Sequence, residues 1–94
     1  MSDRKFILIV EDERDLAELL RYNLNVGGYA AEVARDGRQG LEMVQARRPD
    51  LIVLDVMLPI YDGITVAKQL RADDATATIP IVMLTAKAAA TGQV

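Results

Sequence analysis

The chain has 94 residues, of which 51% are hydrophobic and 27% charged, and its 11 basic and 14 acidic side chains give a net charge of −3. This length fits one globular domain, the basic residues form no nucleic-acid-binding tract, and no stretch reaches the roughly 20 apolar residues of a membrane helix. Because Cys and His are absent, disulfides, thiolate or imidazole metal sites and a phosphohistidine on this chain are excluded.

Four short apolar runs predict the strands of a sheet. Three of them are continuous and rich in β-branched residues, which is typical of strands covered on both faces, and the second run is more polar, as in an edge strand. The predicted strands are Phe6–Val10, Ala30–Ala34, Leu51–Leu54 and Ile79–Leu84.

Segments with helical periodicity separate these runs. The first helix, of about 14 residues, carries a leucine stripe and ends at Gly27-Gly28, because glycine adopts the left-handed conformation cheaply. The stripe comprises Leu16, Leu19, Leu20 and Leu24, and the side chains expected to face water are Arg14, Glu18 and Arg21.

The second and third helices are shorter. Leu41 and Val44 mark the second, which begins through Asp36-Gly37 and ends before Pro49. The third runs from Gly63 to about Ala72, with its apolar positions at Ile64, Ala67 and Leu70.

Strictly alternating strands and helices predict a parallel sheet with right-handed crossovers, a doubly wound three-layer α/β fold. After the fourth strand only Thr85–Val94 remains, without an apolar stripe. We therefore expect the fourth strand to lie at the sheet edge, although its apolar run is typical of a buried centre, and expect it to be open to pairing with another chain.

Acidic side chains follow two of the predicted strands. Glu11, Asp12 and Glu13 come after the first, and Asp55 follows the third. Ligands of open parallel sheets bind at the carboxyl ends of the strands, where these side chains share one cleft. Carboxylates this close repel one another, and a set of oxygen ligands without Cys or His suits Mg²⁺. A solvated acidic rim is the alternative, because helix N-termini favour acids.

The string from Asp55 to Gly63 is the most specific in the chain. Pro59 and Gly63 shape a loop that returns to the sheet, and Asp62 can cap the third helix. An aspartate at a strand end beside other acids can attack phosphorus and form an aspartyl phosphate. Thr85, one strand away, could donate a hydrogen bond to that phosphoryl group and draw its loop inward as a switch.

Together, Glu11-Asp12, the run Asp55-Val-Met-Leu-Pro59 with Asp62-Gly63, and the run Pro80–Ala86 resemble the receiver domain of bacterial two-component response regulators, particularly those with winged-helix DNA-binding outputs. The resemblance implies a flavodoxin-like fold and a phosphoacceptor that is not an enzyme, with Asp55 phosphorylated by a sensor histidine kinase. Because no apolar stretch reaches the length of a membrane helix or a signal-peptide core, we expect a cytoplasmic location. The resemblance further implies Mg²⁺ bound by Asp12, Asp55 and the Met57 backbone carbonyl, with Glu11 acting through water, and Thr85 as the switch hydroxyl.

The chain departs from the family after its fourth strand. The strand order implied for residues 1–94 is 2-1-3-4, and the fourth helix is cut short, with the fifth strand, its essential lysine and the fifth helix missing. Lys87 is not that lysine, so this chain has no catalytic lysine. We expect residues 1–94 to form a receiver domain that is incomplete at its C-terminus, binds Mg²⁺ and accepts phosphoryl groups poorly.

Three other functions occur on folds of this kind or suit an open sheet edge. A haloacid dehalogenase-type phosphatase needs a second aspartate where Met57 stands, and a nucleotide- or flavin-binding domain needs glycines or hydroxyls where Glu11-Asp12-Glu13 would repel phosphate. The serious alternative is a receiver-derived interaction module that pairs or exchanges segments through its open sheet edge.

Overall fold

In the computed structural model of this chain, residues 4–84 are described. Within them strands and helices alternate as predicted. The elements are β1 (Phe6–Val10), α1 (Arg14–Val26), β2 (Ala30–Ala34), α2 (Gly37–Ala46), β3 (Leu51–Asp55), α3 (Gly63–Ala72) and β4 (Ile81–Leu84). Two boundaries differ from the prediction: β3 includes Asp55, and β4 begins at Ile81, after Pro80, because proline has no N–H to donate to a ladder.

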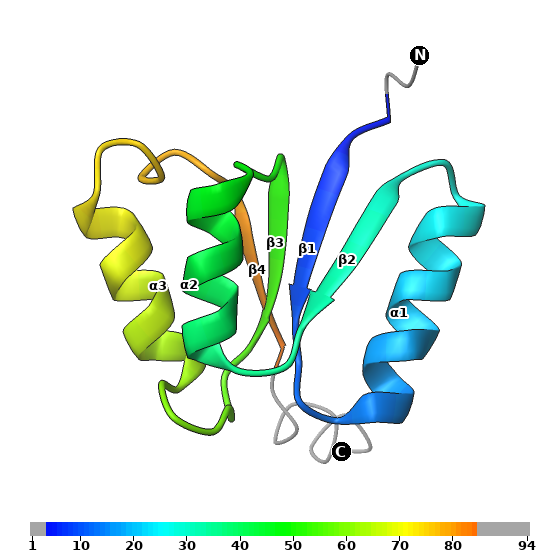
Figure 1. The fold of residues 1–94 in the computed structure, drawn as a ribbon, viewed down its shortest axis with the longest axis horizontal. Helices are drawn as coiled ribbons and strands as arrows, with labels where there is room; N and C mark the ends of the chain where they lie inside the picture. The colour runs from blue at the N-terminus through cyan, green and yellow to red at the C-terminus, as the bar shows by residue number, and fades with distance from the viewer. Residues whose placement is uncertain (1–3, 85–94) are drawn as a thin grey trace, which may run out of the picture.

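The strands form one parallel sheet in the order β2-β1-β3-β4. In the centre of the sheet Ile9 of β1 pairs with Val53 of β3, which pairs in turn with Val82 of β4. Figure 1 shows the sheet standing between α1 on one side and α2 and α3 on the other. The predicted doubly wound, three-layer flavodoxin-like arrangement is confirmed, with β4 at one edge of the sheet.

The core lies mainly between the sheet and the pair α2 and α3. Alternate residues of β1 and β3 point into this layer, since successive strand side chains face opposite sides of a sheet. Its largest contributors are fully buried or nearly so: Leu8, Val10, Ile52, Leu54, Val44, Val66, Leu70 and Ile79. This layer fixes the ends of β1 and β3, from which the site is built.

The leucine stripe predicted for α1 is only partly buried. Ala17 is the one buried residue of this helix, whereas Leu16 and Leu19 are 38% and 58% exposed. Leu20 and Leu24 are half-buried. Helical period places these leucines on one side, but burial needs a second element over them. Within residues 4–84 the elements that chiefly lie against α1 are β1 and β2.

The apolar face of α3 is also displaced from the prediction. Val66 and Leu70 are buried against the core, while Ile64 is 52% exposed. The helix turns Val66 toward α2 and the sheet, and Ile64, in the first turn, consequently faces outward beside the loop that follows Asp55.

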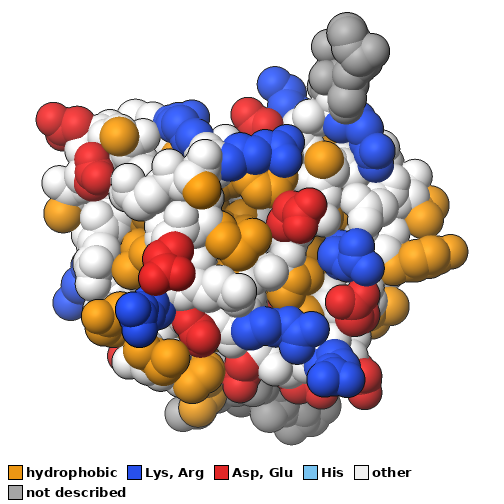
Figure 2. All heavy atoms as spheres, viewed as in Figure 1, with side chains coloured by type: hydrophobic (Ala, Val, Ile, Leu, Met, Phe, Trp, Pro, Cys, Tyr) orange, Lys and Arg blue, Asp and Glu red, His pale blue; other side chains and the backbone are white. Residues whose placement is uncertain are grey.

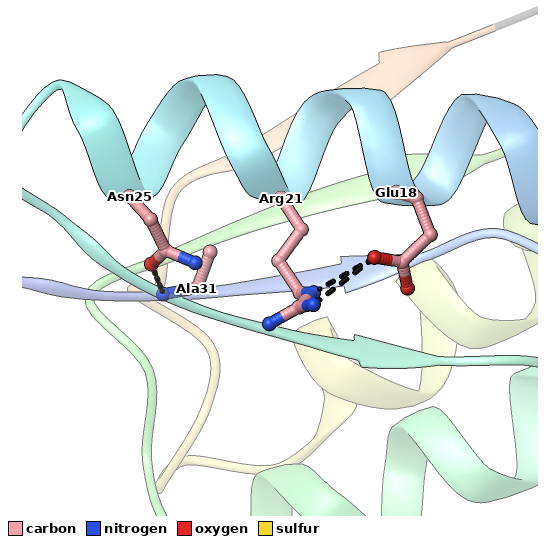
Figure 3. Close-up of polar contacts among 4 residues, drawn as sticks. All are labelled: Glu18, Arg21, Asn25 and Ala31. Atoms are coloured by element: carbon pink, nitrogen blue, oxygen red, sulfur yellow. Dashed lines mark hydrogen bonds and ion pairs between the residues drawn. The ribbon is translucent and has the colours of Figure 1, made fainter.

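The C-terminus of α1 is held to the start of β2. Gly28, with φ of 99°, takes the left-handed conformation that ends the helix. The Asn25 side-chain oxygen accepts a hydrogen bond from the Ala31 N–H at 3.0 Å, one turn away from the exposed Arg21–Glu18 ion pair at 3.0 Å (Figure 3). These contacts set the direction in which β2 joins β1.

The face shown in Figure 2 carries basic and acidic side chains interspersed, with no large patch of one sign. Among the residues that the structure describes, no helix has the length and apolar character required to cross a membrane.

Candidate functional site

Three carboxylates meet at the carboxyl ends of β1 and β3. Asp55 is the last residue of β3, and Glu11 and Asp12 directly follow β1, its neighbour in the sheet. Each side chain offers an oxygen, and these oxygens all lie within 4.8 Å of one another. Parallel pairing of two adjacent strands is enough to bring them together, as expected from the sequence.

The three acids differ in exposure. Glu11 and Asp55 are 2% and 8% exposed, whereas Asp12 is exposed to solvent. Between described residues, no Lys or Arg forms an ion pair with any of them; Arg21 and Arg38 pair instead with Glu18 and Glu42. Two negative charges at such separations repel by about 3 kcal/mol at an effective dielectric of about 20. Among the described residues no basic side chain offsets this repulsion, so the cluster suits a cation.

Backbone N–H groups orient the two buried carboxylates. The Glu13 N–H donates to Oε2 of Glu11 at 2.9 Å, and the Met57 N–H donates to Oδ1 of Asp55 at 3.1 Å. Burial raises the pKa of Glu11 from its ordinary 4.5 to about 7; the Glu13 N–H opposes this rise and the negative charge of Asp55 adds to it. Glu11 therefore gives up its proton less readily than an ordinary glutamate, and positive charge entering the cluster would favour its ionised form.

Glu13 does not belong to the cluster, although the sequence places it in the same acidic run. Its side chain caps α1 by accepting a hydrogen bond from the Leu16 N–H at 2.7 Å. This is the position where a helix N-terminus favours an acceptor. For Glu13, the interpretation of the acidic run as a helix-terminal rim is therefore the right one.

The loop after β3 is tied closely to the strand end. The Gly63 N–H donates to the Val56 carbonyl at 2.8 Å, and a Cβ atom added at Gly63 would collide with the Asp55 carbonyl oxygen and lie 2.7 Å from Val56 Cα. Asp62 caps α3 by accepting from the Thr65 N–H at 2.8 Å. These contacts hold the first turn of α3 against the backbone of Asp55 and Val56.

Beside the cluster an open groove of about 520 Å³ runs along this loop. Met57 is 65% exposed at its rim. The groove gives a ligand access to the cluster from the loop side, and it is lined by Asp12, Val56, Met57, Leu58, Pro59, Asp62 and Ile64.

Two features of this loop were not foreseen. Ile60 has φ of 70°, and Gly37, predicted only as part of a helix entry, lies against Tyr61. No sequence pattern marks the first, and an Asp-Gly pair before a helix does not reveal which loop will pack on it. Thr85 and Lys87 lie outside the described residues.

The chain is similar to one family throughout its length. A family model described as a response regulator receiver domain matches residues 7–93. Among curated relatives, the alkaline phosphatase synthesis transcriptional regulatory protein PhoP of Bacillus subtilis is 52% identical over 83 residues, which cover 88% of this chain and 34% of that protein. Response regulator MprA of Mycolicibacterium vanbaalenii is 47% identical, over 86% of this chain and 34% of that protein. This chain thus spans about a third of the length of these relatives.

Solved structures agree with the sequence comparison. The receiver domain of the Francisella response regulator 1452 aligns with a TM-score of 0.82 at 29% identity, over 88% of this chain and 67% of that one. The chemotaxis response regulator CheY4 of Vibrio cholerae aligns with a TM-score of 0.85 at 29% identity, over 96% of this chain and 77% of that one.

Proposed function

The chain belongs to the response regulator receiver domain family, and on that premise we propose that Asp55 is the residue that accepts the phosphoryl group. Receiver domains of this family are phosphoacceptors of two-component systems and receive the group from sensor histidine kinases. The observation that carries the assignment is the position of Asp55 at the carboxyl end of β3, with oxygens of Glu11 and Asp12 within 4.8 Å.

Asp55 suits the role of nucleophile better than its neighbours do. Oδ1 accepts a hydrogen bond from the Met57 N–H, which orients the carboxyl group beside the residues Val56 and Met57 that line the groove. Glu11 is more deeply buried and has a raised pKa, so it is a weaker nucleophile near neutrality. Asp12 is exposed and lies one residue beyond Glu11, on the loop leading to α1.

The donor set of the cluster fits Mg²⁺, which is bound through carboxylates, carbonyls and water. Asp12, Asp55 and the Met57 backbone carbonyl would hold the ion directly, and Glu11 through water. When bound there, Mg²⁺ supplies positive charge that offsets the negative phosphoryl oxygens. The grouping of oxygens from the three acids, all within 4.8 Å of one another, is the support for this assignment.

The proposed transfer has a simple balance. An Asp55 carboxylate oxygen forms a bond to the phosphorus of a phosphohistidine, the N–P bond breaks, and its electron pair remains on the imidazole nitrogen. The residues of this chain position the acceptor, so a small phosphoramidate donor can replace the kinase in the same reaction. We propose no catalytic activity beyond self-phosphorylation and the later hydrolysis of the acyl phosphate.

The remaining predicted residues have supporting roles in this proposal. Asp62 and Gly63 fix the start of α3 against Asp55. Pro59 shapes the loop between Asp55 and Asp62. Thr85, which follows β4 in the sequence, is proposed as the switch hydroxyl that contacts the phosphoryl group.

The test is phosphorylation of the purified chain by phosphoramidate, with and without Mg²⁺, followed by intact mass. Because the chain lacks the family's catalytic lysine, we expect slow and incomplete labelling that requires Mg²⁺ and adds one phosphoryl group. The labelling should be lost in Asp55→Asn and retained in Asp74→Asn, a matched change at an exposed site. Labelling that persists in Asp55→Asn would overturn the assignment of Asp55.

A second function, self-association through β4, has one supporting observation. Val82 and Met83 of β4 are 48% and 38% exposed, and among the described residues no strand pairs with the outer side of β4. Light scattering over a range of concentrations tests it. A concentration-dependent dimer that is lost in Met83→Lys, without any need for Mg²⁺, is the expected result; a monomer throughout would contradict it.

A further inference from the structure

The loop of residues 56–62, which follows Asp55, is held at two points. The first is Gly63, where close approach to the Asp55 carbonyl leaves no room for a side chain. The second is Gly37, the buried first residue of α2, which reaches the loop from a different part of the chain.

Gly37 lies directly against the backbone of Tyr61. A Cβ atom added at Gly37 would collide with the Tyr61 carbonyl oxygen, and it would lie 2.8 Å from Tyr61 Cβ and 2.8 Å from Cγ2 of Val66. Distances under 3.0 Å are not found between real Cβ atoms and their neighbours, so one side must move. Neither neighbour yields easily, because one is backbone and Val66 is 1% exposed in the core.

Ile60, which directly precedes Tyr61 in the loop, has a strained backbone conformation. Its φ of 70° is unfavourable for a β-branched residue. Its side chain is 68% exposed, so burial of Ile60 itself does not account for the strain. Such conformations persist when surrounding contacts impose them, and the contacts here are those at Tyr61 and Gly63.

We propose that Gly37 is a positioning residue for Asp55: by allowing α2 to lie against Tyr61, it fixes the path of the loop, and thereby the Met57 N–H that orients the Asp55 carboxylate. The functional effect of this inference rests on the proposed function, because a displaced loop would weaken both Mg²⁺ binding and phosphorylation of Asp55. The loop geometry itself does not depend on that function.

The test compares Gly37→Ala with Gly40→Ala, a matched change in the same helix. A Cβ atom at Gly40 would lie 3.1 Å from both methyl groups of Val10, so it disturbs the core rather than the loop. We expect Gly37→Ala to weaken Mg²⁺ binding at least tenfold by calorimetry and to speed hydrogen exchange at the Met57 and Gly63 amides. Gly40→Ala should lower Tm while Mg²⁺ affinity stays within twofold of wild type.

A second substitution separates positioning from simple destabilisation. Ile60→Gly gives the loop another path, so in the Gly37→Ala background it should restore Mg²⁺ affinity severalfold, while alone it should leave affinity within twofold. Equal losses of affinity in Gly37→Ala and Gly40→Ala, or no rescue by Ile60→Gly, would overturn the proposal.

Two further outcomes are decided by other readouts. If wild type binds no Mg²⁺, the proposed function fails, and unchanged exchange at Met57 and Gly63 in Gly37→Ala would independently overturn the positioning role. If Gly37→Ala does not fold, an NMR titration of wild type with Mg²⁺ decides: the Gly37 and Tyr61 amides should shift with the same midpoint as Met57, and unshifted amides would contradict the proposal.

Discussion

Glu11 and Asp55 present carboxylate oxygens within 4.8 Å of each other, although they come from the ends of two different strands, and both side chains are almost completely buried. Burial of two acids without a basic partner is unfavourable unless a proton or a cation joins them. Burial raises the pKa of Glu11 to about 7, so protonation of this side chain relieves the repulsion as the pH falls below neutrality.

The raised pKa of Glu11 predicts an unusual pH dependence of stability. The folded state binds the Glu11 proton more tightly than the unfolded state does, so protonation stabilises the fold. This stabilisation is fully present below about pH 4.5 and is lost as the pH rises through about 7. Without Mg²⁺, this group should lower the free energy of unfolding by about 3 kcal/mol across that window. Denaturant unfolding at several pH values measures it.

Glu11→Gln is the control for this pH effect. The amide cannot ionise, so the slope between pH 4.5 and 7 should flatten, whereas Glu18→Gln on the exposed side of α1 should leave it unchanged. A slope that is the same in wild type and Glu11→Gln would contradict the assigned pKa.

Mg²⁺ is expected to stabilise the fold, because binding removes the repulsion among the three acids. A ligand present at 100 times its Kd adds about 2.7 kcal/mol to the free energy of unfolding. Thermal unfolding should therefore shift upward with Mg²⁺ in wild type, and much less in Asp12→Asn. Asp15→Asn, an exposed change in the first turn of α1, should respond as wild type does; an equal Mg²⁺ shift in Asp12→Asn would place the ion elsewhere.

The Asp62 cap should contribute measurably to the stability of α3. Its carboxylate accepts the Thr65 N–H at 2.8 Å, and loss of such a cap costs about 1 kcal/mol. We expect Asp62→Ala to lower the free energy of unfolding by that amount in a urea titration, and Asp62→Asn, which retains an acceptor, to be nearly neutral. Equal losses in the two variants would show that the cap is not the cause.

The close contact at Gly63 predicts a larger effect than the cap. A Cβ atom there meets backbone of Asp55 and Val56, which cannot move aside as a side chain does. Gly63→Ala should destabilise the protein by about 2–3 kcal/mol, in the range of overpacked cores. At Gly27 the nearest atom to an added Cβ is 3.4 Å away, so Gly27→Ala should be tolerated; similar Tm losses for both would contradict this account.

Most of the fold and the convergence of the acids could be predicted from the sequence. Continuous apolar runs specify buried parallel strands, and parallel strands bring their carboxyl ends, and hence Asp55 and Glu11, to one edge. The Asp62 cap is equally local, since an acceptor before a helix bonds within its own first turn.

What could not be predicted depends on which element packs against which. Periodicity marks Leu19 as apolar but does not say whether any element covers it, and in the described structure it is 58% exposed. The acidic run does not show that Glu13 differs from Glu11 and Asp12. Glu13 caps α1 because its carboxylate accepts a hydrogen bond from the Leu16 N–H. The approach of Gly37 to Tyr61 and the strain at Ile60 arise from tertiary packing alone.

The most direct measurement is to locate the phosphoryl group on the chain. After treatment with phosphoramidate and Mg²⁺, reduction with borohydride converts a phosphorylated aspartate to homoserine, which peptide mass spectrometry finds at a single residue. The account predicts homoserine at Asp55 and only when Mg²⁺ is present. Homoserine at Asp12, or the same yield at Asp55 with Mg²⁺ removed by chelator, would contradict it.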